Sequence, residues 1–225
     1  MYKFDTHVHT AEVSPCATLG AADVAKLYHK AGYSGICITD HYNGYVFDYW
    51  SRTTWEKRLD KFLEGYRKAK EAGGKYDLDV LLGVELSLSC SVYWIDYILF
   101  GMTEQFLRDY PDLHKYEPKA LRELADENGI LIFQAHPFRS GNACENPLFL
   151  DGVEAMNGSQ SNEVNDLAAK FAKENNLLIS VGSDCHSREG VGRSGILTTE
   201  RIRNMEMLKR SLTESTERKT NAHTN

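Results

Sequence analysis

FDTHVHTAEVS, residues 4–14, places two histidines and two carboxylates along and just after a predicted strand. The overlapping segment YKFDTHVH, residues 2–9, alternates in the manner of a half-buried β-strand. Side chains two positions apart on a strand project from the same face, so His7 and His9 should present their imidazoles side by side. Glu12 follows on the next loop. The stretch therefore offers two imidazoles side by side, with a carboxylate returning on the following loop.

Six further apolar runs follow, and helix-period segments separate most of them. The runs are residues 34–40, 79–88, 93–101, 130–136, 152–157 and 177–184. Strands that alternate with helices favour a parallel sheet, and seven strands in a chain of 225 residues predict an α/β barrel smaller than the usual eightfold one. A doubly wound open sheet is the alternative, because periodicity does not separate the two. The third and fourth of the seven predicted strands, residues 79–88 and 93–101, are close enough in sequence to form a hairpin.

The chain is expected to form a single domain over residues 1–213. From Glu214 onward the sequence ESTERKTNAHTN is polar, and we expect residues 214–225 to form a disordered tail.

The bulk composition narrows the class of protein. The formal net charge is −6 and there is no basic stripe, so the electrostatic footprint of a nucleic-acid binder is missing. The five cysteines include no C-x-x-C pair, which argues against a disulfide framework and fits a reducing compartment. No apolar run approaches membrane-spanning length. We expect a soluble cytoplasmic protein that binds neither a nucleic-acid polymer nor a membrane.

Histidines and carboxylates gather where the predicted strands end. In α/β folds the carboxyl ends of parallel strands point to one face, so these residues should converge although they are distant in sequence. The candidate metal ligands are His7, His9, Glu12, His41, Glu85, Asp96, His136, Asp184 and His186. Imidazole and carboxylate ligands suit zinc, iron or manganese. Since one ion takes three or four protein ligands, this set predicts two or three divalent ions with some carboxylates bridging.

Asp5 and Asp40 are candidates for outer-sphere partners of the ligands. A ligating histidine usually donates its second N–H to a carboxylate or a carbonyl, which fixes its tautomer. The alternative for Asp5 is a hydrogen bond at a turn or strand end. Asp40 could instead cap a helix.

Five short motifs occur in a recognisable order along the chain. They are DTHVHT at 5–10, ITDH at 38–41, GVE at 83–85, AHP at 135–137 and SDCH at 183–186. Together they resemble the polymerase and histidinol phosphatase (PHP) family over residues 5–186. The resemblance implies a distorted (β/α)7 TIM-like barrel with a trinuclear metal centre.

The same resemblance implies a distribution of ligands among three ions. The first ion would take His7, His9, Glu85 and Asp184. The second would share Glu85 and add His136, and the third would take His41 and His186.

Two ligand positions that often hold histidine in the family differ here. After the H-x-H motif the candidate is Glu12, and at the start of the fourth strand it is Asp96. An acidic residue is familiar in the family at the first of these positions. The second depends on the pattern DYILFG alone, and without Asp96 the second ion would be weakly held.

Phosphoester cleavage suits a cluster of metal ions, which can activate water and clamp the attacking and leaving oxygens. Arginine is the planar donor that matches a phosphate, and similar arginines contact the substrate phosphate in phosphatases of the family. Arg139 in HPFR and Arg193 in the glycine-bearing loop after SDCH are candidates for that contact. Asn157, at the end of the sixth strand, could also face the substrate; its alternative is a turn residue. The groups expected to take part in catalysis are Asp184, His186, Arg139 and Arg193.

We therefore expect a metal-dependent phosphoesterase, specifically a phosphomonoesterase that hydrolyses a small-molecule phosphate with a metal-activated hydroxide. Histidinol phosphate and small nucleotides are candidate substrates. Two alternatives stay open. One is an amidohydrolase, which would not need Arg139 and Arg193, and the other is a non-catalytic metal-binding module.

Overall fold

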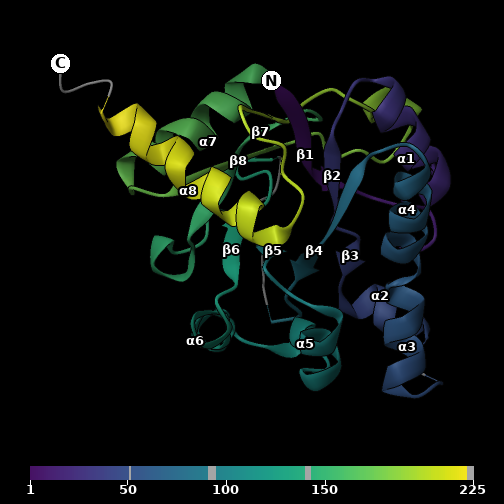
Figure 1. Cartoon of the computed structure of the whole chain (residues 1–225). Coiled ribbons are helices and arrows are strands. Elements are labelled where there is room, and N and C mark those ends of the chain that lie inside the picture. The colour runs from purple at the N-terminus through teal and green to yellow at the C-terminus, as the bar shows by residue number, and fades with distance from the viewer. Residues whose placement is uncertain (51, 91–94, 140–142, 222–225) are drawn as a thin grey trace.

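The computed structural model describes residues 1–50, 52–90, 95–139 and 143–221 (Figure 1). The strands of this part of the chain are β1 (Tyr2–Val8), β2 (Gly35–Ile38), β3 (His41–Tyr42), β4 (Asp79–Ser87), β5 (Asp96–Phe100), β6 (Leu131–Gln134), β7 (Gly152–Asn157), β8 (Leu178–Gly182) and β9 (Ile196–Thr198). The α-helices are α1 (Ala21–Lys30), α2 (Gly44–Tyr49), α3 (Trp55–Phe62), α4 (Glu64–Lys75), α5 (Glu104–Asp109), α6 (Pro118–Asn128), α7 (Asn162–Glu174) and α8 (Met205–Asn221).

The strands form one barrel-shaped sheet in a single domain. Their order is β8-β7-β6-β5-β4-β2-β1-β9, and β3 pairs with β4 beside this path. The two ends approach each other, because Val8 bridges Cys185 and the Thr6 hydroxyl donates to the Val181 carbonyl at 3.1 Å. The sheet is therefore a nearly closed barrel, and the predicted fold class is confirmed over the doubly wound alternative.

All seven predicted strands are present, but not all of them are parallel. β5 runs antiparallel to both β4 and β6. Only residues 88–95 separate β4 from β5, and a parallel crossover needs a dozen residues or more. So short a connection permits only the antiparallel pairing of β4 and β5, as expected for a hairpin. The short strands β3 and β9 were not predicted.

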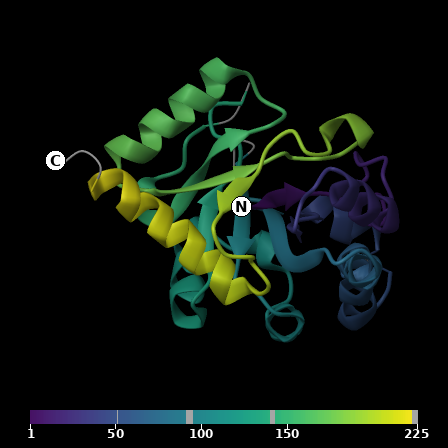
Figure 2. The ribbon, with the colours of Figure 1, turned by 45° about the horizontal axis from the view of Figure 1, so that its top comes forward.

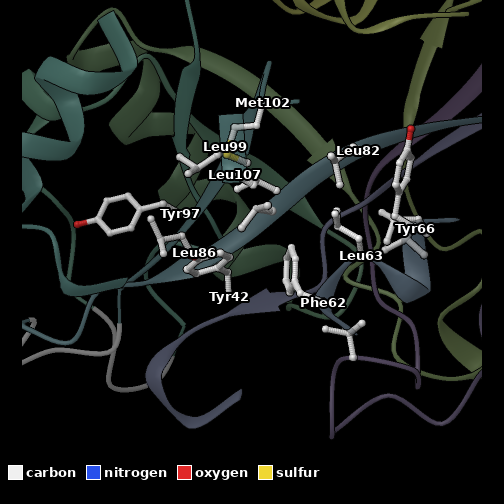
Figure 3. Packing of buried hydrophobic residues seen from close by; sticks show 14 of the residues in the cluster. Tyr42, Phe62, Leu63, Tyr66, Leu82, Leu86, Tyr97, Leu99, Met102 and Leu107 are labelled. Atoms are coloured by element: carbon white, nitrogen blue, oxygen red, sulfur yellow. The ribbon is translucent and has the colours of Figure 1, made fainter. Parts of the chain in front are cut away.

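Two sets of apolar side chains lie on opposite faces of the sheet. Along β4, Leu81 joins one buried cluster, whereas Val80 and Leu82 join the other. This alternation is the period of two in a strand. The cluster that contains Val80 and Leu82 is the outer one and packs against the helices around the barrel; Figure 3 shows its residues Phe62 and Leu63 together with residues of β4 and β5. The cluster that contains Leu81 is the inner one. Each fully buried Leu or Phe side chain contributes about 1.5–3 kcal/mol to stability.

Helix α8 covers the end of the barrel where β6 begins. Its residues Leu208 and Leu212 are buried in the inner cluster with Phe4 and Phe133. The Lys209 ammonium donates to the carbonyl of Gly129, just before β6, at 2.8 Å. In both views α7 and α8 lie on one side of the molecule, and α1 and α4 lie on the other (Figures 1 and 2). The opposite end of the barrel remains open for a site.

Several helix boundaries follow ordinary capping chemistry. The hydroxyls of Thr54, Thr103 and Ser161 accept backbone N–H groups at the starts of α3, α5 and α7. Gly129 ends α6 with φ of 64°, a left-handed conformation that glycine adopts without strain. At the C-terminus, where the sequence predicts a polar tail from residue 214, α8 continues to Asn221, and residues 222–225 lie outside the described part of the chain.

None of the helices in the described ranges is long and apolar enough to cross a membrane.

Candidate metal centre

The candidate ligands converge at the carboxyl ends of the parallel strands. His7 is the penultimate residue of β1 and His9 follows the strand. Glu85 lies near the end of β4, and His136 and Asp184 follow β6 and β8. Along β4 the inward positions change from Leu81 in the apolar cluster to Glu85 at the rim. The barrel therefore has an apolar floor and a polar mouth.

Asp96 reaches the same rim although it begins its strand. Because β5 is antiparallel to β4, its first residue lies opposite the end of β4, and Asp96 pairs with Ser87. The Ser87 hydroxyl donates to Asp96 Oδ1 at 2.5 Å, and Asp96 Oδ2 lies 3.8 Å from His136 Nε2. Reversal of one strand thus places Asp96 beside the predicted ligands.

Three overlapping groups of side chains have donor atoms close enough to hold a metal ion. They are His9, His41 and His186; His7, His9 and Glu85; and Glu85, Asp96 and His136. Asp184 joins them, because its Oδ1 lies 3.5 Å from His7 Nε2 and 3.4 Å from His9 Nε2. Eight of the nine predicted ligands are therefore brought together, and Glu85 connects two of the groups.

The histidine tautomers suit metal binding. His7 donates its Nδ1–H to Glu154 at 2.9 Å, and His186 donates its Nδ1–H to the Asp184 carbonyl at 3.0 Å. His9 Nδ1 lies 3.1 Å from the Ser14 hydroxyl, whose own proton is donated to Asp40 at 2.7 Å. When these rings are neutral, each turns an Nε2 lone pair inward, as ligating histidines do.

Several of these inward atoms face one another without a satisfying hydrogen bond. The Nε2 atoms of His7 and His9 are 3.0 Å apart. Buried Glu85 Oε2 and Asp184 Oδ1 have no hydrogen bond of acceptable geometry among the described residues. Facing lone pairs and orphaned carboxylate oxygens are costly when buried unless a cation lies between them. The residues present therefore fit a metal cluster.

The electrostatics of the rim favour the binding of a cation. Burial alone would raise the pKa of Glu85, but His41 and His7 hold it well below the usual value. Burial likewise opposes ionisation of Asp184, and His7 and His186 keep the pKa of that carboxyl well below its usual range. Burial, together with the charge on His41, lowers the pKa of His9 to about 3. The rim therefore presents ionised carboxylates beside a neutral imidazole.

Glu154 is a functional side chain that the sequence interpretation missed. It is fully buried in β7 and accepts the Nδ1–H of His7, the backbone N–H of His136 at 3.0 Å and the amide of Asn157 at 2.8 Å. His136 has φ of 28° and Asp184 has φ of 54°, so both hold left-handed backbone that non-glycine residues seldom adopt. Glu154 thus orients one imidazole and helps to hold the strained backbone of another. A lone carboxylate inside the apolar strand GVEAMN was the available signal.

Asp40 acts through Ser14. Its carboxylate accepts the backbone N–H and hydroxyl of Thr10, at 2.7 and 2.6 Å, in addition to the Ser14 hydroxyl. Gly65 in α4 lies so close that a Cβ atom there would clash with both Thr10 and Asp40. This packing fixes the loop that follows β1, and through it the ring of His9.

Asp5 supports the backbone of the rim and contacts no imidazole among the hydrogen bonds of the described chain. It accepts the N–H groups of His7 and Ser183, at 3.1 and 3.0 Å, and the Tyr28 hydroxyl at 2.7 Å. Burial raises the pKa of Asp5 to about 6, although these hydrogen bonds oppose the shift. The carboxylate therefore joins β1 to the loop after β8.

Glu12, expected among the metal ligands, and Asn157, expected to face the substrate, contact other partners. The Glu12 carboxylate accepts the backbone N–H of Ala21 at 2.9 Å, at the start of α1, and Lys68 lies 3.8 Å away. A carboxylate at a helix N-terminus is favourable for the helix dipole. Asn157 is fully buried and links Glu154 to Ser159, rather than lining the cleft.

Cys16 occupies the rim where Glu12 was expected. Its Sγ lies 3.2 Å from His41 Nε2. Burial opposes ionisation of the thiol, but hydrogen bonds with His186 and His41 lower the pKa of Cys16 to about 6. Cys16 was not among the predicted site residues, since a single cysteine in a loop has no pattern of its own.

A cleft of about 480 Å³ opens over the cluster. Both predicted arginines line it: Arg139 donates to Asp96 Oδ2 at 3.3 Å, and Arg193 donates to the Glu189 carbonyl at 2.8 Å. Ser159, whose hydroxyl lies 3.1 Å from Asp184 Oδ2, lines it as well. The cleft is large enough for a small ligand.

The described chain resembles several solved structures. A two-domain protein from Bacteroides vulgatus that contains a predicted PHP-like metal-dependent phosphoesterase matches with a TM-score of 0.67 and 17% identity, over 94% of this chain and 62% of that one. A putative metal-dependent phosphoesterase from Bifidobacterium adolescentis matches with a TM-score of 0.56 and 16% identity, over 92% and 94% of the two chains. An amidohydrolase from Chromobacterium violaceum, with bound sulfate and no metal, matches with a TM-score of 0.62 and 16% identity, over 92% and 96%. At these identities the likeness shows a shared fold.

Family models agree with the ordered motifs. No curated protein matches the chain. The model described as the PHP domain matches residues 5–133, more than half of the chain, and the model described as PHP-associated matches residues 162–216. Taken with the barrel and the cluster at its mouth, these matches mean that the chain belongs to the PHP family.

Proposed function

We propose that this protein is a metal-dependent phosphomonoesterase that acts on a small-molecule phosphate in the cytoplasm. The observation that carries the proposal is the position of Arg139 and Arg193 on the wall of a cleft whose floor holds the ligand cluster. The five cysteines are free thiols, which supports a reducing compartment. The cleft's modest volume supports a small substrate.

In the proposed centre two or three divalent ions, zinc, manganese or iron, bind the predicted ligands. His7, His9, Glu85 and Asp184 would hold the first ion. Glu85, His136 and Asp96 would hold the second, and His41 and His186 the third. Such ions lower the pKa of water and neutralise charge on a transferring phosphoryl group.

The remaining groups act on the substrate or on the ligands. Arg139 and Arg193 bind the equatorial phosphate oxygens, and a guanidinium matches two of them at once. Arg139 already lies 3.3 Å from Asp96, so it is oriented beside the cluster before substrate binds. Glu154 and the Asp40–Ser14 pair keep the rings of His7 and His9 in place. Such fixed orientation contributes to catalysis because the reacting groups need no further ordering.

Hydrolysis of p-nitrophenyl phosphate by protein loaded with Mn²⁺ or Zn²⁺ tests the proposal. We expect turnover, and we expect the double variant Arg139→Ala/Arg193→Ala to lose kcat/KM on the order of 100-fold or more, as for loss of a transition-state donor. Arg210→Ala, at an exposed position on α8, is the matched control and should keep full activity. No turnover in protein shown to carry metal contradicts the proposal and favours the non-catalytic module.

Amide hydrolysis is the second candidate, because one structure with the same fold is described as an amidohydrolase. The arginine variants separate the two reactions. An amidohydrolase has no phosphate to bind, so the loss of both guanidinium groups should leave its kcat/KM nearly unchanged, whereas a phosphatase should lose most of it.

Glu85 provides an independent check of the metal assignment. It lies 2.9 Å from His136 Nε2 and 3.4 Å from His9 Nε2, so it can join two ions. Glu85→Gln should therefore lower both bound metal and rate. Full metal occupancy with a normal rate in this variant contradicts its bridging role.

A further inference from the structure

The thiol of Cys16 lies where a third protein ligand would complete the ion position between His41 and His186. Its Sγ is 3.2 Å from His41 Nε2, which in turn is 3.4 Å from His186 Nε2. Cys16 is exposed on the loop between β1 and α1 and also lines the cleft. His41 Nε2 thus lies within 3.4 Å of both the thiol and His186 Nε2, at the open side of the cluster.

The two imidazoles present lone pairs toward this point. His186 donates its Nδ1–H to the Asp184 carbonyl at 3.0 Å, which leaves Nε2 as an acceptor. His41 Nδ1 lies 2.7 Å from Glu85 Oε2, so its Nε2 is also turned away from the carboxylate and toward the thiol. Two acceptors 3.4 Å apart repel each other unless a proton or a metal ion lies between them.

The loop itself holds the thiol in place. The Thr18 N–H donates to the His186 carbonyl at 2.7 Å, which ties the loop to the segment after β8 that carries His186. The Ala17 N–H donates to the Ser14 carbonyl at 2.9 Å. Glu12, the acidic group in the same loop, is engaged by the N–H of Ala21. Of the two, the thiol is therefore the group that the loop presents to the histidines.

We propose that the Cys16 thiolate directly ligates the ion held by His41 and His186, and that it makes this position selective for Zn²⁺ over Mn²⁺. The inference rests on the metal centre of the proposed function and adds a ligand and a preference to it. Thiolate is a soft ligand that suits zinc, whereas manganese prefers oxygen ligands. Two imidazoles and one thiolate also leave a fourth position open on a tetrahedral zinc, the pattern of catalytic zinc sites.

Cobalt substitution tests the proposal without any measurement of turnover. Metal-free full-length protein is titrated with Co²⁺, and a sulfur-to-cobalt charge-transfer band is sought in the near ultraviolet. We expect the band in the wild type and its loss in Cys16→Ser. Cys144→Ser, which removes a free thiol elsewhere, should keep the band.

Two further measurements address metal preference and folding. Competition with a chromogenic chelator should show that Cys16→Ser loses more zinc affinity at one site than the roughly 10–100-fold that a lost outer-sphere contact costs. Manganese affinity should change much less. Cys16→His should restore the number of bound ions while the sulfur band stays absent, which excludes a folding defect as the cause.

The outcomes separate this inference from the proposed function. Zn²⁺ should slow alkylation of Cys16 by iodoacetamide, followed by mass spectrometry of its peptide. Equal alkylation rates with and without Zn²⁺, or an unchanged cobalt band in Cys16→Ser, overturn the inference and leave Cys16 as a free thiol. A clear band in protein that hydrolyses no phosphoester supports the ligand and rejects the proposed function alone.

Discussion

Glu154→Gln is the perturbation that best isolates how the fold orients the metal ligands. The carboxylate is fully buried and accepts hydrogen bonds from His7 Nδ1 at 2.9 Å, from the His136 N–H at 3.0 Å and from Asn157 Nδ2 at 2.8 Å. These donors approach both of its oxygens. Glutamine has one carbonyl oxygen and one NH₂ group, so at one side of the side chain a donor must face a donor.

The size of the effect follows from this count. An opposed or unsatisfied buried hydrogen-bonding group costs about 1–3 kcal/mol, so the metal-free variant should lose about that much stability. Loss of an outer-sphere partner of a ligating histidine typically weakens metal binding by about 10–100-fold. That range equals about 1.4–2.8 kcal/mol of binding free energy. Both effects should therefore be within easy reach of measurement.

Two assays separate these effects. Urea unfolding of the metal-free protein gives the stability, and chelator competition gives the zinc affinity. Glu174→Gln is the control, because Glu174 is exposed on α7 and its pair with Lys170, at 3.8 Å, should contribute less than about 0.5 kcal/mol. Wild-type zinc affinity and wild-type stability in Glu154→Gln would refute the reasoning.

Other changes test the packing that supports the site. Gly65→Ala should lower the stability and the metal content, since its Cβ would clash with the Thr10 hydroxyl. Gly74→Ala, in the same helix, is the control: its Cβ meets nothing within 4 Å, so it should leave both unchanged or slightly raise the stability. Equal thermal melting of the two variants speaks against the packing argument. Leu208→Ala should lower the free energy of unfolding in urea by about 2–5 kcal/mol, because Leu208 is fully buried under the barrel. Leu167 is half-exposed, so Leu167→Ala should lower it far less. Comparable losses would mean that α8 does not seal the core. Removal of metal with a chelator should lower the melting temperature, because ions that bind only the folded state stabilise it; an unchanged melting curve after proven metal loss would contradict a built-in cluster.

The positions of the strands could be predicted from the sequence better than their parallel or antiparallel directions. Each of the seven strands was found because short apolar runs bounded by turns are a strong local signal. The antiparallel β5 depends on the short connection after β4, and the two-residue β3 is too short to carry a pattern. The division between α3 and α4 at Leu63 lies inside one continuous helical periodicity. These features follow from tertiary packing.

The convergence of the ligands could be predicted because strand ends share a rim. His7, His136 and Asp184 follow from that rule alone. The directions in which Glu12 and Cys16 point could not be predicted, because a loop has no fixed period to set where a side chain points. Its path depends on bonds to distant residues, such as the contact of Thr18 with His186.

The role of Glu154 illustrates the remaining gap. A glutamate within an apolar strand can face inward or outward, and the register of β7 with β8 shifts between Glu154 and Met156. Such an irregularity decides which face a side chain occupies, and it leaves no mark in composition. The buried partners of a metal ligand are therefore found from the structure.

Crystals of the full-length protein loaded with Zn²⁺ or Mn²⁺, measured at and away from the metal absorption edges, give the most direct view of the rim. We predict at least two anomalous peaks among the side chains that surround Glu85, each within bonding distance of an imidazole. Well-ordered histidines at the barrel mouth with no anomalous peak beside them, in protein exposed to excess metal, would contradict this prediction.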